Sequence, residues 1–441
     1  MKSIKFILAA AVLLAGQLLW AQDIILTTDH ENGLYAKGEQ VNVYAALNTE
    51  SASNPLLLVK VNGKNVIKNR PVELTAEKTV VYSGTFDEAS YITVSASATG
   101  DFKDAKNYSK IGVVVGAEDY VPGFEEPADF MKFWQDEVKA MRKSKIKAKT
   151  KAVAVDGKLE KYADKVDAYD LQINMPEGNP VRAYIAFPKN AQNGSHPIII
   201  MPHGAGVRTS NLFNAVYWAA RGCIAIDINA HGILNGQDKE YYKELGNGEL
   251  KGYFKREITD RDSFYFRLMY LRMQRVLDYA TTLPEWDNQR VIVKGSSQGG
   301  GQSAVLAGLD SRVTMAVLQV PALCDMGGKL AHHTGGWPTN YSKTIHKDES
   351  ALAREVLPYF DGANFLRHTN AKLIIDCGLV DTTCAPEAVI STFNAAASTD
   401  KTLYTFPYRN HSAKKMTKQQ RAQWQKTVEK PMLNAIKAYI K

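Results

Sequence analysis

Two patterns of apolar and polar residues divide the chain. Between residues 23 and 115, apolar residues alternate with polar ones at a period of two, and pairs such as Asn32-Gly33 mark turns between the runs. The clearest predicted strands are Val41–Leu47, Leu56–Val61 and Tyr91–Ser97. Short alternating strands with turns between them are typical of two packed antiparallel sheets. We therefore predict an immunoglobulin-like β-sandwich over residues 22–116, with packing, spacing or carbohydrate binding as its open roles.

Beyond Pro122 and Pro127 the pattern changes to short apolar runs that alternate with helical periodicity. Helices are predicted at Ala128–Met141, Phe213–Ala220, Phe266–Thr281 and Gln419–Ile440. The predicted strands are Tyr169–Ile173, Ala183–Phe187, Pro197–Met201, Cys223–Ile228, Val291–Val293, Ala316–Val320, Leu373–Asp376 and Thr402–Phe406. This alternation predicts one α/β domain over residues 117–441, with a mostly parallel sheet covered by helices on both faces. Ligands of such sheets bind at the carboxyl ends of the strands.

The first 21 residues have the composition of a secretory signal. Lys2 and Lys5 precede the apolar run Ile7–Leu19, and Ala21 offers a small residue for cleavage. No cysteine stands directly after this run, where a lipid would be attached, and no later run of about 18 apolar residues could span a membrane. We therefore expect an exported protein, periplasmic or secreted, that is cleaved near Ala21 and neither carries a lipid anchor nor inserts in a membrane.

The charge and the cysteine content bear on whether the protein binds nucleic acid or a metal ion. The formal net charge is +8, and part of the excess lies in one basic run between Lys139 and Lys151, which we interpret as a solvated helix end and linker. Nothing else favours a nucleic-acid partner. The four cysteines, Cys223, Cys324, Cys377 and Cys384, form no C-x-x-C motif, so no metal site is predicted. Cys377 and Cys384 are close enough in sequence to permit a disulfide.

A Gly-x-Ser-x-Gly motif, formed by Gly295, Ser297 and Gly299, is the strongest candidate for chemistry. The β-branched run Val291–Val293 precedes it and a helical pattern follows, which is the strand, turn and helix context of a nucleophile elbow. Such a turn is so tight that it tolerates only small residues around its serine. It also aims the next backbone N–H, that of Gln298, at a substrate oxygen. We therefore predict Ser297 as a nucleophile.

A serine nucleophile needs a base and an acid that orients the base, and in this fold they follow the serine in the order acid, histidine. Asp381 lies in a loop directly after the apolar run Leu373–Ile375 and is the predicted acid. Asp361 and Asp400 lack a preceding strand. The sequence therefore favours Asp381.

The predicted base is His411, which lies between the last predicted strand and the terminal helix. His346 and His368 precede the acid in sequence, and His332 and His333 lie in a segment of uncertain structure. His411 occupies the last loop of the domain, as the base of such a triad does.

A second oxyanion donor is expected from a loop after an early strand. The apolar run Ile198–Met201 is followed by His203-Gly204, where the chain can turn closely. We therefore predict that the N–H of Ala205 faces the same oxygen as the N–H of Gln298. This chemistry needs no cofactor.

From about Pro127 to its C-terminus, the sequence resembles the acetyl xylan esterase and cephalosporin C deacetylase family of α/β-hydrolases. The matching pieces are Asp129-Phe130, Phe133-Trp134, His203-Gly204, Arg208, Tyr265–Leu309 with Asp310, Val320–Asp325 and Gly378–Pro386. The resemblance implies an α/β-hydrolase fold and places the triad on Ser297, Asp381 and His411. It also places the oxyanion N–H groups on Gln298 and Ala205.

The chain departs from the family pattern around the predicted acyl pocket. The family usually has a tyrosine where this chain has Ala205, and its Arg-Gly-Gln motif is replaced by Asn229–His231. The stretches Gly236–Asp262 and His332–Trp337 look like local additions. Loss of a ring beside the oxyanion hole changes the shape of the pocket, whereas the triad and the backbone donors remain.

We therefore predict an exported serine carbohydrate esterase that removes acetyl groups from plant cell-wall polysaccharide or its oligosaccharides. Arg208, His231 and Trp337 are candidate substrate contacts. A pectin methylesterase acting on methyl-esterified uronate is the second hypothesis, favoured by the altered pocket and the residual basic charge. The sequence also leaves open a peptidase of the same fold and a non-catalytic carbohydrate-binding protein, and it does not determine the oligomeric state.

Overall fold

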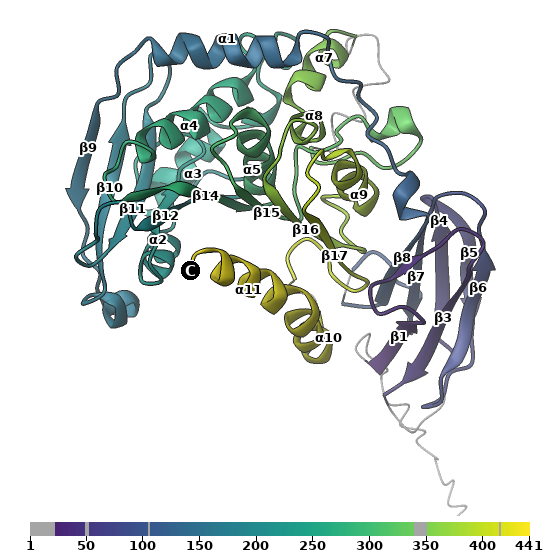
Figure 1. The fold of residues 1–441 in the computed structure, drawn as a ribbon. Coiled ribbons are helices and arrows are strands. Elements are labelled where there is room, and N and C mark those ends of the chain that lie inside the picture. The colour runs from purple at the N-terminus through teal and green to yellow at the C-terminus, as the bar shows by residue number, and fades with distance from the viewer. Residues whose placement is uncertain (1–22, 49–52, 105, 339–350, 414–415) are drawn as a thin grey trace, which may run out of the picture.

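A β-sandwich lies beside one end of a larger α/β body (Figure 1). The structure is a computed structural model that describes residues 23–48, 53–104, 106–338, 351–413 and 416–441. The predicted signal segment, residues 1–21, lies outside the described residues. None of the helices in the described ranges has an apolar stretch long enough to cross a membrane.

The sandwich consists of a three-stranded sheet in the order β1-β3-β6 and a five-stranded sheet in the order β2-β8-β7-β4-β5. The strands are β1 Ile24–Thr28, β2 Leu34–Tyr35, β3 Gln40–Leu47, β4 Leu56–Val61, β5 Lys64–Pro71, β6 Thr79–Thr85, β7 Ser90–Ser97 and β8 Ser109–Val115. Alternate residues of β3, such as Val41 and Val43, meet Leu57 and Val59 of β4 in a core of the sandwich's own. The predicted two-sheet packing follows from this alternation.

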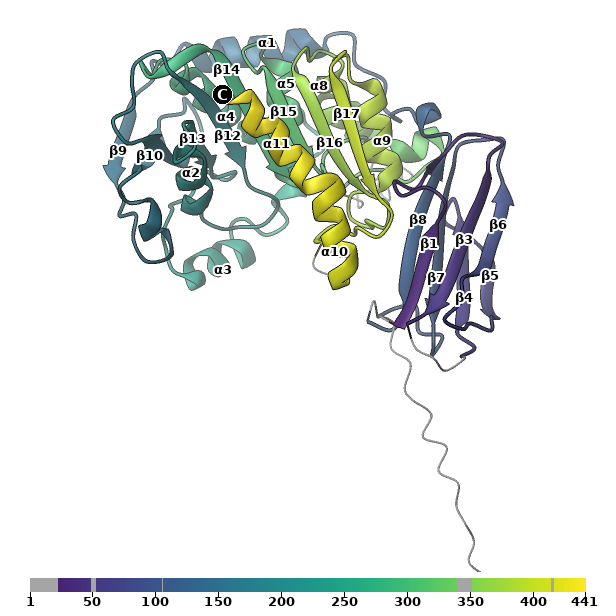
Figure 2. The same cartoon turned by 60° about the horizontal axis from the view of Figure 1, so that its bottom comes forward.

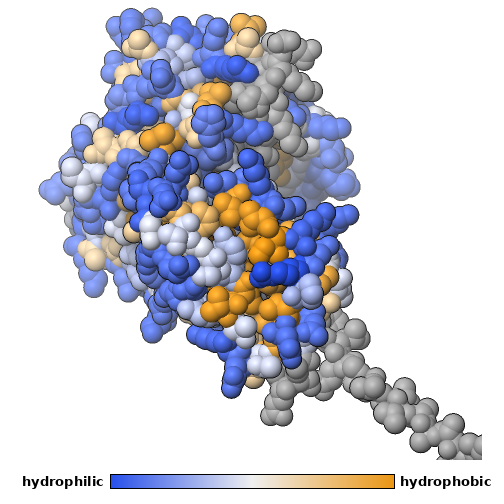
Figure 3. Space-filling view, turned by 90° about the vertical axis from the view of Figure 1, so that its right-hand side faces the viewer, coloured by the Kyte–Doolittle hydropathy of each residue, from blue (hydrophilic) through white to orange (hydrophobic). Residues whose placement is uncertain are grey.

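The outer surface of the sandwich carries apolar side chains in the view of Figure 3. The large hydrophobic side chains exposed on its strands are Ile25, Val66 and Val80. All three are aliphatic, so they offer no aromatic face on which a sugar ring could stack.

The α/β body is built on a nine-stranded sheet in the order β17-β16-β15-β14-β12-β13-β11-β10-β9. Its strands are β9 Ala148–Ala152, β10 Val166–Ile173, β11 Val181–Pro188, β12 His196–Pro202, β13 Ile224–Ile228, β14 Trp286–Ser296, β15 Met315–Gln319, β16 Lys372–Gly378 and β17 Lys401–Phe406. The six strands from β12 to β17 run parallel to one another, whereas β9, β10 and β11 pair antiparallel with one another and β11 pairs antiparallel with β13. The predicted parallel sheet is therefore confirmed, with an antiparallel extension.

Helices cover both faces of this sheet (Figures 1 and 2). The helices are α1 Phe130–Arg142, α2 Leu212–Ala219, α3 Lys239–Asn247, α4 Tyr265–Ala280, α5 Gln298–Leu309, α7 Ala351–Val356, α8 Gly362–Leu366, α9 Pro386–Ala395, α10 Lys418–Trp424 and α11 Lys430–Tyr439. Val291 and Val293 pack toward α1, α4 and α5, while Ile292 packs toward α2 and α11. Because neighbouring residues of a strand face opposite sides, both faces are buried and the strand reads as a continuous apolar run.

Two predicted segments differ in detail. The basic run, interpreted as a helix end and linker, also forms β9, whose five residues are all exposed. Lysines suit such an edge strand because their charge opposes pairing with another sheet. The terminal helix is predicted as one element, but a wider turn at Gln425–Glu429 separates α10 from α11.

Candidate active site

Ser297 lies in a strained turn between β14 and α5, at the carboxyl end of a central strand. Its φ and ψ angles are 57° and −126°, a conformation that side chains seldom adopt. A Cβ atom on Gly295 would clash with the carbonyl of Gly299, and one on Gly299 would clash with the carbonyl of Pro202. Both glycines are therefore required by contact as well as by the turn, which holds the serine hydroxyl above the sheet edge.

The structure brings Ser297, His411 and Asp381 into one hydrogen-bonded set. His411 Nε2 lies 2.9 Å from Ser297 Oγ, and His411 Nδ1 lies 2.8 Å from Asp381 Oδ2. The other Asp381 oxygen accepts from the backbone N–H groups of Thr383 (2.7 Å) and Cys384 (3.0 Å). The Asp381 side chain is fully buried, whereas 27% of the His411 side chain is exposed. The acid is thus fixed, and the histidine reaches from it to the serine.

The loop after β12 passes directly beside Ser297. A Cβ atom on Gly204 would lie 3.5 Å from the Cβ of Ser297, which brings the neighbouring Ala205 to the edge of the serine turn. The N–H of Gln298 is the first of α5, and the first N–H groups of a helix have no acceptor within it. Gln298 thus follows the serine directly and the loop that carries Ala205 passes beside it, while the oxyanion role of their two N–H groups stays a prediction.

Tyr253 is a site residue that the sequence did not reveal. It belongs to the stretch Gly236–Asp262, which looked like a local addition. Its hydroxyl donates to Oε1 of the buried Gln298 side chain and accepts from the N–H of Gly206 at 3.5 Å. One ring from this stretch therefore joins both loops that carry the predicted oxyanion donors. It stands near the position where the family's usual tyrosine is replaced by Ala205.

The three predicted substrate contacts have different surroundings. Arg208 is exposed and donates from Nη2 to the Gly204 carbonyl at 2.8 Å. His231 is fully buried, and its Nδ1 lies 2.8 Å from the Tyr265 hydroxyl. Trp337 is half-buried, with its ring 5.5 Å from that of Phe254. Arg208 can therefore reach a ligand directly, whereas the buried His231 packs against the rings of Tyr253 and Tyr265.

His203 and His231 are held in their neutral forms. Burial lowers the pKa of His203 to about 4, and the nearby Arg208 contributes to the shift. His203 Nδ1 donates to the Gly204 carbonyl at 2.6 Å, so Nε2 accepts from the N–H of Ala230 at 3.2 Å. Burial likewise lowers the pKa of His231 to about 3. Protonation of His203 at Nε2 would set its N–H against the N–H of Ala230 and break this contact.

We expect acid to destabilise the protein through these two histidines. Their pKa values are lower in the folded than in the unfolded chain, so between about pH 6.5 and pH 4 the unfolded chain binds more protons. The stability present at pH 7 should therefore fall as the pH falls through this window. In His203→Asn, which retains a donor toward Gly204, the difference in Tm between pH 7 and pH 4.5 should shrink. The exposed His332→Gln should keep the full difference; equal shrinkage in both variants would contradict this explanation.

The aspartates and histidines that the sequence did not favour as the acid or base of the triad have other partners. Asp361 caps α8 by accepting from the N–H of Ala363 at 2.9 Å, and Asp400 pairs with Lys372 at the surface. His368 contacts Glu126 at 2.8 Å, and His333 contacts Asp325 at 3.3 Å. His346 lies outside the described residues.

The sandwich contacts the loops that carry the acid and the base. The Tyr91 hydroxyl on β7 donates to the carbonyl of Leu379, two residues before Asp381, at 2.7 Å. The Gly112 N–H on β8 donates to the carbonyl of Pro407, four residues before His411, at 3.0 Å. A Cβ atom on Gly112 would clash with the Leu379 carbonyl, so the two surfaces are in close contact. The sandwich therefore supports both loops from one side.

We expect Tyr91→Phe to lower activity without touching the site. The change removes a donor and leaves the Leu379 carbonyl unsatisfied, at a cost of about 1–3 kcal/mol. The kcat for an aryl acetate should fall several-fold with little change in KM, and Tm should fall by a few degrees. Tyr44→Phe is the matched control, because it removes a tyrosine hydrogen bond to Asp29 elsewhere in the sandwich. An unchanged kcat in Tyr91→Phe would show that the contact does not position the acid.

The cysteines are all buried, free thiols. The disulfide that the spacing of Cys377 and Cys384 permits is therefore not formed. Asp381, Cys384 and His411 have potential metal-binding atoms within 4.8 Å of one another. Both His411 nitrogens are engaged, however, and burial raises the pKa of the Cys384 thiol well above its usual value. This set therefore suits proton transfer better than metal binding, because Cys384 would have to be a thiolate to bind a metal ion.

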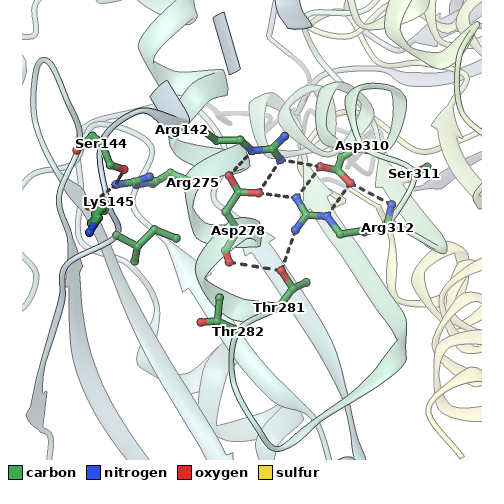
Figure 4. A pocket seen from close by; sticks show the side chains of 11 residues that line it. Arg142, Ser144, Lys145, Arg275, Asp278, Thr281, Thr282, Asp310, Ser311 and Arg312 are labelled. Carbon is green, nitrogen blue, oxygen red and sulfur yellow. Dashed lines mark hydrogen bonds and ion pairs between the residues drawn. The ribbon is translucent and has the colours of Figure 1, made fainter. Parts of the chain in front are cut away.

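A separate cavity of about 620 Å³ lies between the ends of α1 and α4 and the turn after α5 (Figure 4). Arg142 and Arg312 form ion pairs there with Asp278 and Asp310. The charges satisfy one another and contact none of the three residues of the hydrogen-bonded set. Asp310, one of the residues in the family resemblance, therefore has a structural role in this network of ion pairs.

Parallel strands that end at a hydrogen-bonded serine, histidine and aspartate are the arrangement of the α/β-hydrolases, and the fold and the site assign the chain to this class. Residues 116–428 match the acetyl xylan esterase (AXE1) family, and the chain belongs to that family.

A related sequence and two solved structures are consistent with membership of this family. The acetyl esterase Axe7A of Xylanibacter ruminicola is 29% identical over 398 residues, which cover 87% of this chain and 85% of the relative. The acetyl xylan esterase from Paenibacillus sp. R4 superposes with a TM-score of 0.56 at 27% identity, covering 67% of this chain and 93% of that structure. Acetyl xylan esterase 1 from Thermoanaerobacterium sp. JW/SL YS485 gives a TM-score of 0.57 at 22% identity, covering 70% and 96%, and supports the fold alone.

Proposed function

We propose that this protein is an exported serine esterase that removes acetyl groups from plant cell-wall polysaccharide, with acetylated xylan as the leading substrate. The observation that carries the proposal is the hydrogen-bonded set of Ser297, His411 and Asp381 at the sheet edge. Membership of the acetyl xylan esterase family and the names of the relatives support the substrate class. The charged and apolar residues of the first 21 positions support export.

The geometry supports a two-step acyl transfer. His411 Nε2 takes the proton of Ser297 Oγ, and the oxygen attacks the ester carbonyl to form a tetrahedral intermediate. Asp381 keeps His411 in the tautomer that presents Nε2 as an acceptor, and it stabilises the imidazolium that forms. His411 then protonates the sugar oxygen, which leaves. Water, deprotonated by the same histidine, attacks the acetyl-enzyme and releases acetate.

The backbone N–H groups of Gln298 and Ala205 would stabilise the oxyanion. They flank Ser297, and the amino-terminal end of α5 adds a partial positive charge at the same point. Tyr253 supports both donors at once, because it contacts Gln298 and Gly206. No cofactor enters this mechanism.

We also propose that the N-terminal sandwich is immunoglobulin-like. Its sheets, β1-β3-β6 and β2-β8-β7-β4-β5, divide the eight strands between two layers, as in that architecture. Its contacts with Leu379 and Pro407 favour a supporting role beside the site over a free spacer.

Product analysis tests the function. The mature protein is incubated with acetylated xylan and with methyl-esterified pectin, and acetate and methanol are quantified against a Ser297→Ala blank. Acetate alone is expected. Methanol alone would identify a pectin methylesterase, and hydrolysis of aminoacyl amides without action on glycan esters would identify a peptidase. Complete inertness, even toward aryl acetates, would favour a non-catalytic carbohydrate-binding protein.

A further inference from the structure

A second cavity, of about 310 Å³, adjoins the catalytic serine on the face of the sheet covered by α2. It lies between the start of α2 and the carboxyl ends of β12 and β14. Gly204 and Ser296 belong to its wall, and both flank Ser297, one in space and one in sequence. A group bound here therefore lies next to the turn that carries Ser297.

A lysine occupies a strand position in this cavity that the fold would otherwise fill with an apolar residue. Lys294 is two residues after Ile292 on β14, so it points to the same face of the sheet. Ile292 is part of the core on that face, which α2 and α11 cover (Figure 2). It is half-buried, and burial lowers its pKa. Removing an ammonium group from water in the middle of a sheet is costly unless the charge has a partner.

Neither cation of the cavity is in direct contact with a carboxylate in the described part of the chain, although Asp227 and Glu429 are near enough to Lys294 to act against the lowering of its pKa. Among the described residues, no ion pair is formed by Lys294 or by Arg208. Lys294 Nζ donates to the amide oxygen of Gln319 at 3.0 Å, and Arg208 donates to the Gly204 carbonyl. The described residues that line the cavity include no aspartate or glutamate.

The nearest buried acid is already engaged. Asp227 accepts from the Asn211 N–H at 2.7 Å and from Asn214 Nδ2 at 2.8 Å. Burial also raises the pKa of its carboxyl to about 7, so at neutral pH it carries only part of a charge. Asp227 and Glu429 therefore offset the cost of burying Lys294 only in part, because its pKa stays lowered and neither acid forms an ion pair with it in the described part of the chain.

We propose that this cavity is a subsite for a carboxylate of the substrate, supplied by a uronate residue next to the acetylated sugar and held by Arg208 and Lys294. The two donors suit an anion, because charge-assisted hydrogen bonds to a carboxylate are among the strongest in proteins. The subsite rests on the proposed function, since it selects among acetylated polysaccharides those that carry uronate side groups.

The test compares two matched substrates. Acetylated xylan oligosaccharides that carry uronate side groups are compared with the same oligosaccharides after reduction of the carboxyl to an alcohol. We expect kcat/KM to be about tenfold higher for the uronate form, the size of one good charge-assisted contact. In Lys294→Met and in Arg208→Gln this ratio should fall toward one.

Arg221→Gln is the control, because Arg221 lies beyond the far end of α2 and contacts Tyr217, and it should keep the wild-type ratio. Melting temperature and the rate on an aryl acetate show whether each variant is folded. A ratio of one in the wild type, or a ratio that Lys294→Met leaves unchanged, would overturn the subsite while acetate release still upholds the esterase. Absence of Ser297-dependent acetate from both substrates would overturn the esterase itself.

The cavity could instead bind the carboxylate of the released product, acetate. To distinguish the two sources, free acetate and free glucuronate are compared as inhibitors of hydrolysis of the carboxyl-reduced substrate. Stronger inhibition by glucuronate, relieved in Lys294→Met, is expected. Stronger inhibition by acetate, relieved in the same variant, would assign the cavity to the released product and overturn the proposal.

Discussion

Replacement of Ser297 by alanine should lower kcat for an aryl acetate by about a millionfold, the size of effect found when a serine nucleophile is removed from a triad. The reaction then loses its covalent step, because the hydroxyl that lies 2.9 Å from His411 Nε2 is removed. The fold should survive, because the change removes one oxygen and keeps the small side chain that the turn requires. Tm should therefore stay within about a degree or two of the wild type.

The rate is best measured as product release with purified protein at high concentration, so that a residual signal can be distinguished from contamination. Ser311→Ala is the matched control, because Ser311 is an exposed serine beyond the far end of α5. A Ser297→Ala protein that keeps more than a hundredth of the wild-type rate would rule out the serine as nucleophile.

The second large effect is expected from Asp381→Asn. The amide has nearly the shape of the carboxylate but cannot accept from His411 Nδ1–H in the same way, so the histidine turns to the tautomer that no longer accepts the serine proton. Loss of this orientation costs about ten thousandfold in kcat in a comparable triad. Here the carboxylate also accepts from the N–H groups of Thr383 and Cys384, and an amide NH2 placed toward them would meet donors.

Asp400→Asn is the matched control, since Asp400 pairs with Lys372 at the surface, away from the serine. Single-turnover kinetics with an aryl acetate should show that the acylation rate itself falls in Asp381→Asn. If kcat fell less than tenfold, the acid assigned by sequence and geometry would have to be sought elsewhere.

Much of the site followed from local sequence because its parts are local. The strand before Ser297, the glycines around it and the loops of Asp381 and His411 each lie within a dozen residues of a strong apolar run. Chain order then decided which acid and which histidine belong together. The sheet followed for the same reason, because its buried strands are apolar on both faces.

The residues that sequence did not reveal depend on contacts between distant segments. Tyr253 lies 45 residues before Gln298, in a stretch without a periodic pattern, and only the fold brings its hydroxyl to the site. Lys294 lies in the strand that precedes the motif, but whether it lines a cavity depends on which face of the sheet it points to and on where α2 begins. The edge strand β9 was obscured because alternating lysines resemble a linker.

The contact between the sandwich and the loops of the α/β body has a consequence for the order in which the protein is assembled. The chain is synthesised from its N-terminus, and domains generally fold as they become complete. Tyr91 and Gly112 are made more than 250 residues before Leu379 and Pro407, and the sandwich has a core of its own. We therefore expect the sandwich to be a finished template when the last loops emerge, so that it acts for Asp381 and His411 as a chaperone built into the same chain.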